Sequence, residues 1–186
     1  YDPSTVYWFG ISQGHILGST YVSLSPYVNR AALNVGGGPF SLMMPRSEAF
    51  TPFISFIQIL IPDPLDLQKF IALSQLPMDR VDPITYAPHL IKDGFEGGPK
   101  ERKVMMQIGL YDSLVPNLAS DVHARSVGVA HYTPSVRKVP GLVDVTGPYD
   151  GSALIDFDFK VPPDKQHGVE STIPSENNKV HDNVRK

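Results

Sequence analysis

The sequence predicts an α/β fold in which a mostly parallel sheet is flanked by helices. Short apolar runs suited to buried strands occur at residues 5–9, 31–35, 104–108 and 153–159. Segments with apolar side chains at helical spacing lie between them, at residues 13–24 and 118–127. Strands that alternate with helices are typical of parallel sheets. The 186 residues are 41% hydrophobic, so residues 1–186 are expected to form one domain or most of one.

Composition narrows the class of function. The net charge of −3, with scattered basic residues, argues against a nucleic-acid surface and favours small neutral or apolar substrates. Cysteine is absent, which excludes disulfides, thiolate metal sites and a cysteine nucleophile. No run approaches the ~18 apolar residues that a membrane span needs. The six histidines show no His-x-x-x-His pair within one helix, so neither a metal nor a cofactor is expected.

The first element is a strand that runs into a Gly-x-Ser-x-Gly turn and then a helix. Gly10 and Gly14 leave room around Ser12, whose hydroxyl would stand clear of the sheet as the nucleophile. The N–H of Gln13, at the start of the helix, is the expected oxyanion donor. The alternative is a glycine-rich turn without any chemistry.

Residues 40–76 are unusually apolar and predict two helices, at 48–60 and 64–76. Phe40, Met43, Met44 and Phe53 are candidates for an acyl-binding lid, and ordinary packing onto the sheet is the alternative. Residues 78–99 are rich in proline and glycine and are expected to be a connection without long elements.

The remaining candidate residues follow the later strands. Asp112 comes just after the strand at 104–108, at the sheet edge where Ser12 is also expected. An aspartate there also commonly tightens a turn, and this alternative stays open. A possible strand at 136–145 precedes the one at 153–159, which His167 follows on a loop. His181 lies in a polar terminal run, 175–186, that either begins a helix or is a solvated tail. We therefore favour His167 over His181 as the general base.

Three segments together resemble the α/β-hydrolase family, in particular its esterases and lipases. They are Gly10-Ile-Ser12-Gln-Gly14, Gly109-Leu-Tyr-Asp112-Ser-Leu-Val-Pro116-Asn117 and Gln166-His167-Gly168, in the family's chain order of serine, acid and histidine. The resemblance implies cleavage of carboxylic esters: Ser12 attacks the carbonyl, His167 transfers the proton and Asp112 orients the imidazole.

The resemblance covers only the family fold from the nucleophile strand onward. It implies a carboxyl-terminal portion of one domain, incomplete at the amino terminus, with a helical cap-like insertion at about 40–99. No segment before Ser12 supplies the family's second oxyanion donor, so an amino-terminal companion chain or a homo-oligomer is expected. Two alternatives remain: a serine peptidase of the same fold, and a non-catalytic subunit that needs a partner chain.

Overall fold

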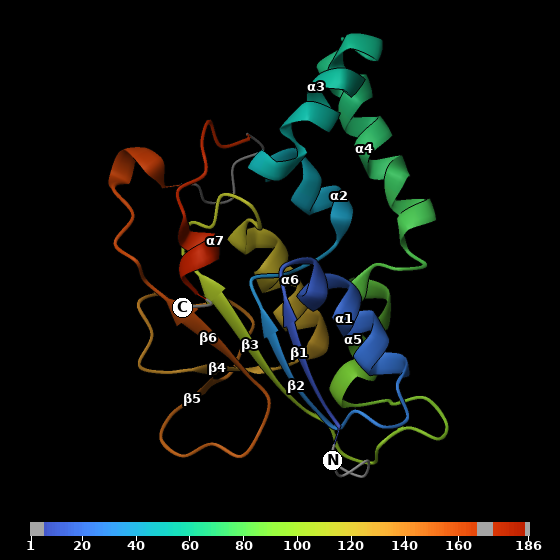
Figure 1. Ribbon diagram of the computed structural model, residues 1–186, viewed down its shortest axis with the longest axis vertical. Helices are drawn as coiled ribbons and strands as arrows, with labels where there is room; N and C mark the ends of the chain where they lie inside the picture. The colour runs from blue at the N-terminus through green and yellow to red at the C-terminus, as the bar shows by residue number, and fades with distance from the viewer. Residues whose placement is uncertain (1–5, 167–172, 185–186) are drawn as a thin grey trace.

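A computed structural model describes residues 6–166 and 173–184 of the chain. Its centre is one sheet with the strand order β1-β2-β3-β6-β4-β5, in which every pairing is parallel (Figure 1). The strands are β1 (Tyr7–Ile11), β2 (Arg30–Asn34), β3 (Lys103–Gly109), β4 (Ala130–Tyr132), β5 (Asp144–Val145) and β6 (Ala153–Phe157). The predicted α/β class with a parallel sheet is therefore confirmed.

Three helices form one layer against the sheet. They are α1 (Gln13–Leu24), α5 (Pro83–Ile91) and α6 (Asn117–Val127), with α5 packed against both α1 and α6. Because β1, β2, β3 and β4 advance across the sheet in one direction, right-handed crossovers place all three helices on the same face. The core lies between them and the sheet, around the fully buried Leu33, Met106 and Leu154.

The two faces of the sheet differ sharply in burial. Gly10, Leu33, Met106 and Leu154 are register partners across four strands, and all four are buried under the helix layer. Phe9, Ala32 and Met105 are the partners one residue earlier, and they point to the opposite face. There, Phe9 is 64% exposed and Met105 39% exposed. Parallel sheets are usually covered on both faces, so this apolar face is a distinguishing feature of the chain.

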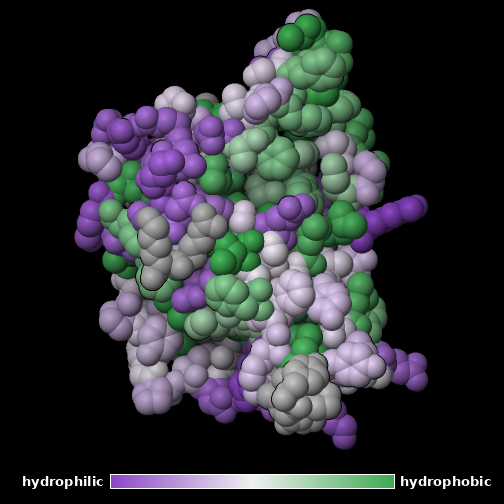
Figure 2. All heavy atoms as spheres, in the orientation of Figure 1, coloured by the Kyte–Doolittle hydropathy of each residue, from purple (hydrophilic) through white to green (hydrophobic). Residues whose placement is uncertain are grey.

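Two long helices project from the body and form a hairpin (Figure 1). These are α3 (Thr51–Leu60) and α4 (Pro64–Met78), close to the predicted ranges, with the first predicted turn formed by a 3-10 helix, η2 (Glu48–Phe50). The short α2 (Phe40–Met43) and η1 (Met44–Arg46) connect the hairpin to the body. Figure 2 shows apolar residues gathered over the hairpin, where Phe56, Ile59 and Leu60 are exposed.

Several predictions were wrong in their detail. The proline-rich region 78–99 contains a complete helix, α5, because Pro83 sits in its first turn, where no N–H is required, and the Asp82 carboxylate accepts from the N–H of Ile84. The strand expected at 136–145 is reduced to β5, and β4 was missed. The remaining two elements are η3 (Pro163–Lys165) and α7 (Val180–Asn183). No helix in the described ranges is long and apolar enough to cross a membrane.

Candidate active site

Ser12 lies at a sharp turn between β1 and α1. Its backbone has φ 57° and ψ −117°, a conformation that costs energy for a residue with a side chain. The turn is held on both sides: the Ser12 N–H donates to the Asn34 carbonyl at 2.8 Å, and the Ser12 carbonyl accepts from the first turn of α1. Gln13 begins that helix, and N–H groups in a first turn have no acceptor inside the helix.

Asp112 forms a buried pair with His181 rather than with a solvent-exposed group. One carboxylate oxygen of Asp112 accepts from the imidazole Nδ1 of His181 at 2.7 Å, and both side chains are almost fully buried. The other oxygen accepts from the N–H groups of Leu114 and Val115, at 2.8 and 3.1 Å. The aspartate therefore tightens its turn and also orients an imidazole. With Nδ1 donating, Nε2 of His181 is left as a lone-pair acceptor.

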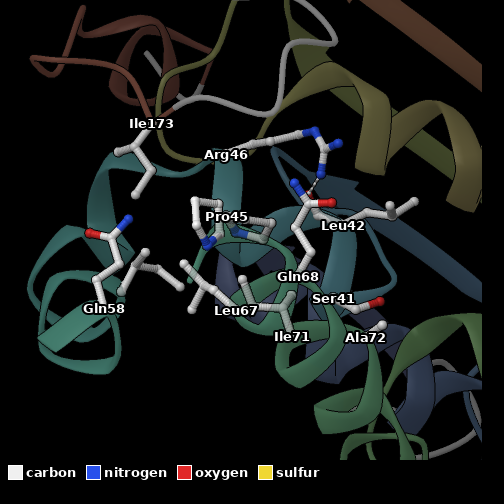
Figure 3. Close-up of a pocket in the computed structure, with 12 residues that line it drawn as sticks. Ser41, Leu42, Pro45, Arg46, Gln58, Leu67, Gln68, Ile71, Ala72 and Ile173 are labelled. Carbon is white, nitrogen blue, oxygen red and sulfur yellow. Dashed lines mark hydrogen bonds between the residues drawn. The ribbon is translucent and has the colours of Figure 1, made fainter. Parts of the chain in front are cut away.

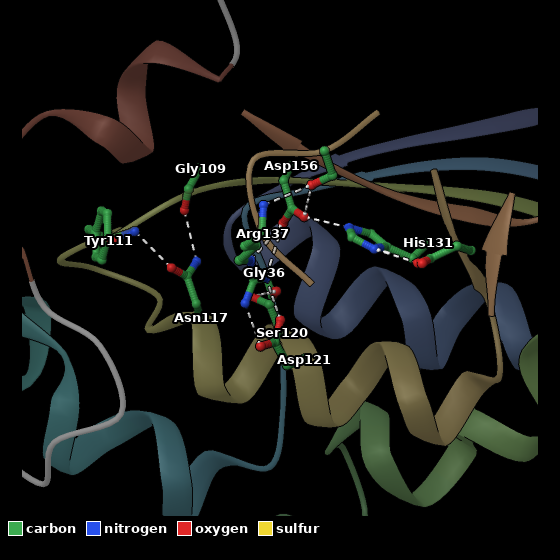
Figure 4. Close-up of polar contacts among 11 residues, drawn as sticks. Gly36, Gly109, Tyr111, Asn117, Ser120, Asp121, His131, Arg137 and Asp156 are labelled. Carbon is green, nitrogen blue, oxygen red and sulfur yellow. Dashed lines mark hydrogen bonds and ion pairs between the residues drawn. The ribbon is translucent and has the colours of Figure 1, made fainter. Parts of the chain in front are cut away.

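Two asparagines fix the loop that carries Asp112. Tyr111 has φ 63°, and its N–H donates to Oδ1 of Asn117, whose Nδ2 donates to the Gly109 carbonyl (Figure 4). On the other side, Nδ2 of Asn178 donates to the Tyr111 carbonyl at 2.6 Å. The Ser113 hydroxyl also donates to Oδ1 of Asn178 and accepts a hydrogen bond from the Asn178 N–H. These contacts bring the segment before His181 against the acid loop.

The structure thus brings His181 to Asp112, and the expectation that His181 is solvated was wrong. The residue that the sequence favoured, His167, lies outside the described residues. Ser12 directly follows β1, and Asp112 follows β3, two strands away. Both residues therefore lie beyond the carboxyl ends of their strands, on the same side of the sheet. Within the described ranges no hydrogen bond joins the Ser12 hydroxyl to His181. Such contacts are often loose before substrate binds.

A second pair of histidines lies behind the Ser12 turn. His15, in the first turn of α1, and His123, on α6, are both fully buried, with Nε2 of His15 at 3.2 Å from Nδ1 of His123. The outer nitrogens, Nδ1 of His15 and Nε2 of His123, have no hydrogen-bond partner among the described residues. Burial lowers the pKa of His15 well below its usual value, and the His123 imidazole lowers it further. Burial also lowers the pKa of His123 to about 4, so both rings are neutral at pH 7.

The loop after β2 fits closely between these helices. A Cβ at Gly36 would collide with the ring of His15, and one at Gly37 would collide with the backbone of Ala119 on α6. The Gly36 carbonyl accepts from the hydroxyl of Ser120 at 2.8 Å (Figure 4). The glycines therefore allow the sheet edge and two helices to approach one another.

An apolar cavity of about 590 Å³ lies beneath the projecting hairpin (Figure 3). Its walls are mainly apolar side chains from α2, η1, α3 and α4, with the guanidinium of Arg46 and the amides of Gln58 and Gln68 among them. Further lining residues are Leu42, Pro45, Ile54, Leu67, Ile71 and Ala72.

The four side chains predicted to bind an acyl group do not line this cavity. Met43 and Phe40 pack with Ile16 of α1 in a small apolar cluster that is separate from the main core. Met44 is buried, and Phe53 is 46% exposed. Their neighbours Leu42 and Ile54 face the cavity instead. Hydrophobicity predicted the two helices of this region, but it did not define which face of each helix turns towards the cavity.

A separate network of ion pairs and hydrogen bonds centres on Arg137 and Asp156. Arg137 pairs with Asp121 at 2.6 Å and with Asp156 at 3.0 Å, and Asp156 accepts from His131 at 2.7 Å (Figure 4). No cluster of three or more potential metal ligands exists in the part of the chain that the structure describes.

Comparison with solved structures identifies the fold. Acetyl xylan esterase 1 from Thermoanaerobacterium sp. JW/SL YS485 matches 87% of this chain and 42% of its own length, with 14% identity and a TM-score of 0.50. Pyrococcus horikoshii acylaminoacyl peptidase matches 86% of this chain and 20% of its own, with 12% identity and a TM-score of 0.46. A Pyrococcus furiosus esterase matches 81% of this chain and 45% of its own, with 12% identity and a TM-score of 0.39.

The chain therefore has the α/β-hydrolase fold, and the resemblance inferred from the sequence is confirmed at that level. It spans less than half the length of each of these structures. No protein-family model matches the chain, and no curated protein matches it either.

Proposed function

We propose that this chain carries the catalytic residues of a serine hydrolase that cleaves carboxylic esters. The observation that carries the proposal is the buried Asp112–His181 pair, at the same sheet edge as the strained turn that presents Ser12. A buried carboxylate that orients an imidazole has the second and third roles of a serine triad. The turn at Ser12 supplies a candidate for the first.

In the proposed reaction, the Ser12 hydroxyl attacks the ester carbonyl while Nε2 of His181 accepts its proton. Asp112 holds the Nδ1–H tautomer and stabilises the imidazolium that forms. The Gln13 N–H donates to the oxyanion, and the helix dipole of α1 adds to this stabilisation. His181 then gives its proton to the leaving alkoxide, which departs as an alcohol. A water molecule then attacks the acyl-enzyme in the same way, gives its proton to His181, and releases the carboxylic acid and free Ser12.

His181 takes the role that the sequence assigned to His167. Its support is the 2.7 Å hydrogen bond to Asp112 and the burial of both groups, which keeps their interaction strong. His167 remains the competing assignment, and comparing the fluorophosphonate labelling of His181→Ala and His167→Ala separates the two.

The proposed substrate is an ester with an apolar acyl group. Support comes from the apolar cavity under the hairpin, and from contacts that join residues next to its wall to both candidate catalytic segments. The Ser47 hydroxyl donates to the Leu114 carbonyl at 2.5 Å, beside Asp112. Met43 packs against Ile16, in the helix that follows Ser12. Residues 40–78 would then act as a cap, whereas α5 packs with the body.

The nucleophile is tested with a fluorophosphonate probe, read by intact mass and peptide mapping. Ser12→Ala should abolish labelling and lower ester turnover by several orders of magnitude. Ser126→Ala, an exposed serine on α6, is the matched control and should react like the unmodified chain. Normal ester hydrolysis by Ser12→Ala would show that another group does the chemistry.

Substrate class is tested by comparing an ester and an amide of the same acyl group. Preferential cleavage of the ester supports the proposal, and efficient cleavage of the amide favours a serine peptidase. If neither the chain nor its complex with a companion polypeptide reacts with the probe, the non-catalytic alternative is correct.

A further inference from the structure

The only tryptophan of the chain, Trp8, is a residue of β1, and its ring packs against the helix that follows Ser12. Its indole N–H donates to the carbonyl of Gly14, in the first turn of α1, at 3.2 Å. The ring also packs against Tyr21, with 4.9 Å between the ring centroids. Gly14, Gly18 and Tyr21 are spaced four and three residues apart and so form one stripe of α1. Trp8 contacts this whole stripe.

Two glycines of α1 and β1 leave the space that the indole fills. A Cβ at Gly18 would collide with Nε1 of Trp8 and with its ring carbons. At Gly10 a Cβ would collide with Nε1 and with the Gly14 carbonyl. By contrast, a Cβ at Gly14 would have no neighbour within 4 Å. Gly10 and Gly18 therefore allow the indole and the first turns of α1 to pack closely against β1.

The first turn of α1 is held by the backbone bonds of Ser12 and by the buried His15, but no side chain caps it. The helix has no side-chain hydrogen bond at its N-cap and no acidic residue in its first turn. Yet Ser12 adopts a backbone conformation that persists only where the surrounding structure determines it. The Trp8–Gly14 bond ties that turn to the strand from outside the helix. The same turn carries the Gln13 N–H, whose direction decides whether it meets an oxyanion.

We infer that Trp8 is a positioning residue, which orients the Gln13 N–H and the Ser12 hydroxyl through its hydrogen bond to the Gly14 carbonyl. The inference rests on the proposed function, because it concerns the geometry of the same nucleophile. A misplacement of a reacting group by about 1 Å can reduce a rate about a hundredfold. Loss of this bond should therefore reduce turnover without weakening substrate binding.

Because Trp8 is the single tryptophan, biosynthetic replacement by benzothienylalanine changes only this position. That residue keeps the bicyclic shape but has sulfur in place of the N–H. We expect kcat for a short ester, and the rate of fluorophosphonate labelling, to fall about tenfold or more, while KM stays within about twofold. Replacement by 4-fluorotryptophan, which keeps the N–H, is the control and should preserve both values.

In a second variant, Gly18→Ala, the added methyl group displaces the indole, and Ser12 and Gln13 are unchanged. It should reproduce the fall in kcat at nearly constant KM, in protein shown to be folded by its circular dichroism. Unchanged kcat and labelling in the benzothienylalanine protein would overturn the inference, because the ring would then only fill space. Absence of labelling in protein with native Trp8, both alone and in complex with the companion polypeptide, would instead refute the proposed function itself.

Discussion

At the scale of single residues, His15 and His123 couple the folding of the site to pH. Both rings are fully buried, and burial lowers the pKa of each below the 6.5 of an exposed histidine. Below pH 6.5 the unfolded chain binds protons that the folded chain cannot accept. Stability is therefore complete above pH 6.5 and is lost as the pH falls towards the folded-state pKa.

The free energy of unfolding should fall between pH 6.5 and 4, by about 3 kcal/mol from the pKa of His123 alone. Urea unfolding at a series of pH values measures this slope. In His123→Leu the free energy of unfolding should depend less steeply on pH, although the variant is less stable at pH 7. Val127→Ala, on the same helix, should lower stability equally at every pH. An unchanged slope in His123→Leu would contradict the buried pair as its source.

The residue scale also shows where sequence analysis was effective. Ser12 and Asp112 became candidates because each sits in a local pattern at the end of a strand. His181 could not be recognised in this way, because its partner Asp112 lies 69 residues away and its own segment is polar. The segment before His181 is held against the acid loop by hydrogen bonds between Asn178 and Ser113, which lie 65 residues apart. Position along the chain therefore ranked His181 below His167.

At the scale of elements, helix α5 explains the main error in the fold prediction. Pro83 and Pro88 suggested a connection without long elements, but Asp82 caps a helix whose first turn accommodates proline. The fully buried Asp82 carboxylate also accepts from the N–H of Phe40, where α2 begins, and from Gln75 on α4. This aspartate thus joins the body to the projecting hairpin through contacts that no local pattern reveals.

The hairpin should determine which esters the protein accepts. Ala72→Trp places a large ring in the cavity, so KM for a long-chain acyl ester should rise about tenfold while that for an acetyl ester stays nearly constant. Leu73→Trp, the neighbouring exposed position outside the cavity, is the control. Equal effects of Ala72→Trp on both esters would show that the cavity does not hold the acyl chain.

At the scale of the whole molecule, the sheet has an open edge and an open face in the described ranges. β1 is the outermost strand at one end of the sheet. Because the Ser12 N–H points to β2, alternation along the strand directs the N–H groups of Tyr7, Phe9 and Ile11 to the open edge. Apolar Phe9 and Met105 occupy the open face. These features favour the companion chain expected from the sequence.

We propose that an amino-terminal companion polypeptide adds a strand beside β1 and covers this face. The amides of Tyr7, Phe9 and Ile11 should then exchange with solvent rapidly in the isolated chain and become protected in the complex. The complex should also show the faster ester hydrolysis, because we expect the companion polypeptide to supply the second oxyanion donor. A monodisperse monomer with the full activity of a longer chain would refute this proposal.

The identity of the general base is the most direct test of the proposed triad. Labelling by a fluorophosphonate is measured as a second-order rate constant for His181→Ala and His167→Ala, each first shown to be folded by thermal unfolding. We predict that His181→Ala reduces this constant by a factor of about a thousand or more, whereas His167→Ala leaves it near that of the unmodified chain. Loss of labelling in His167→Ala together with normal labelling in His181→Ala would contradict the assignment of Ser12, His181 and Asp112 as one catalytic unit.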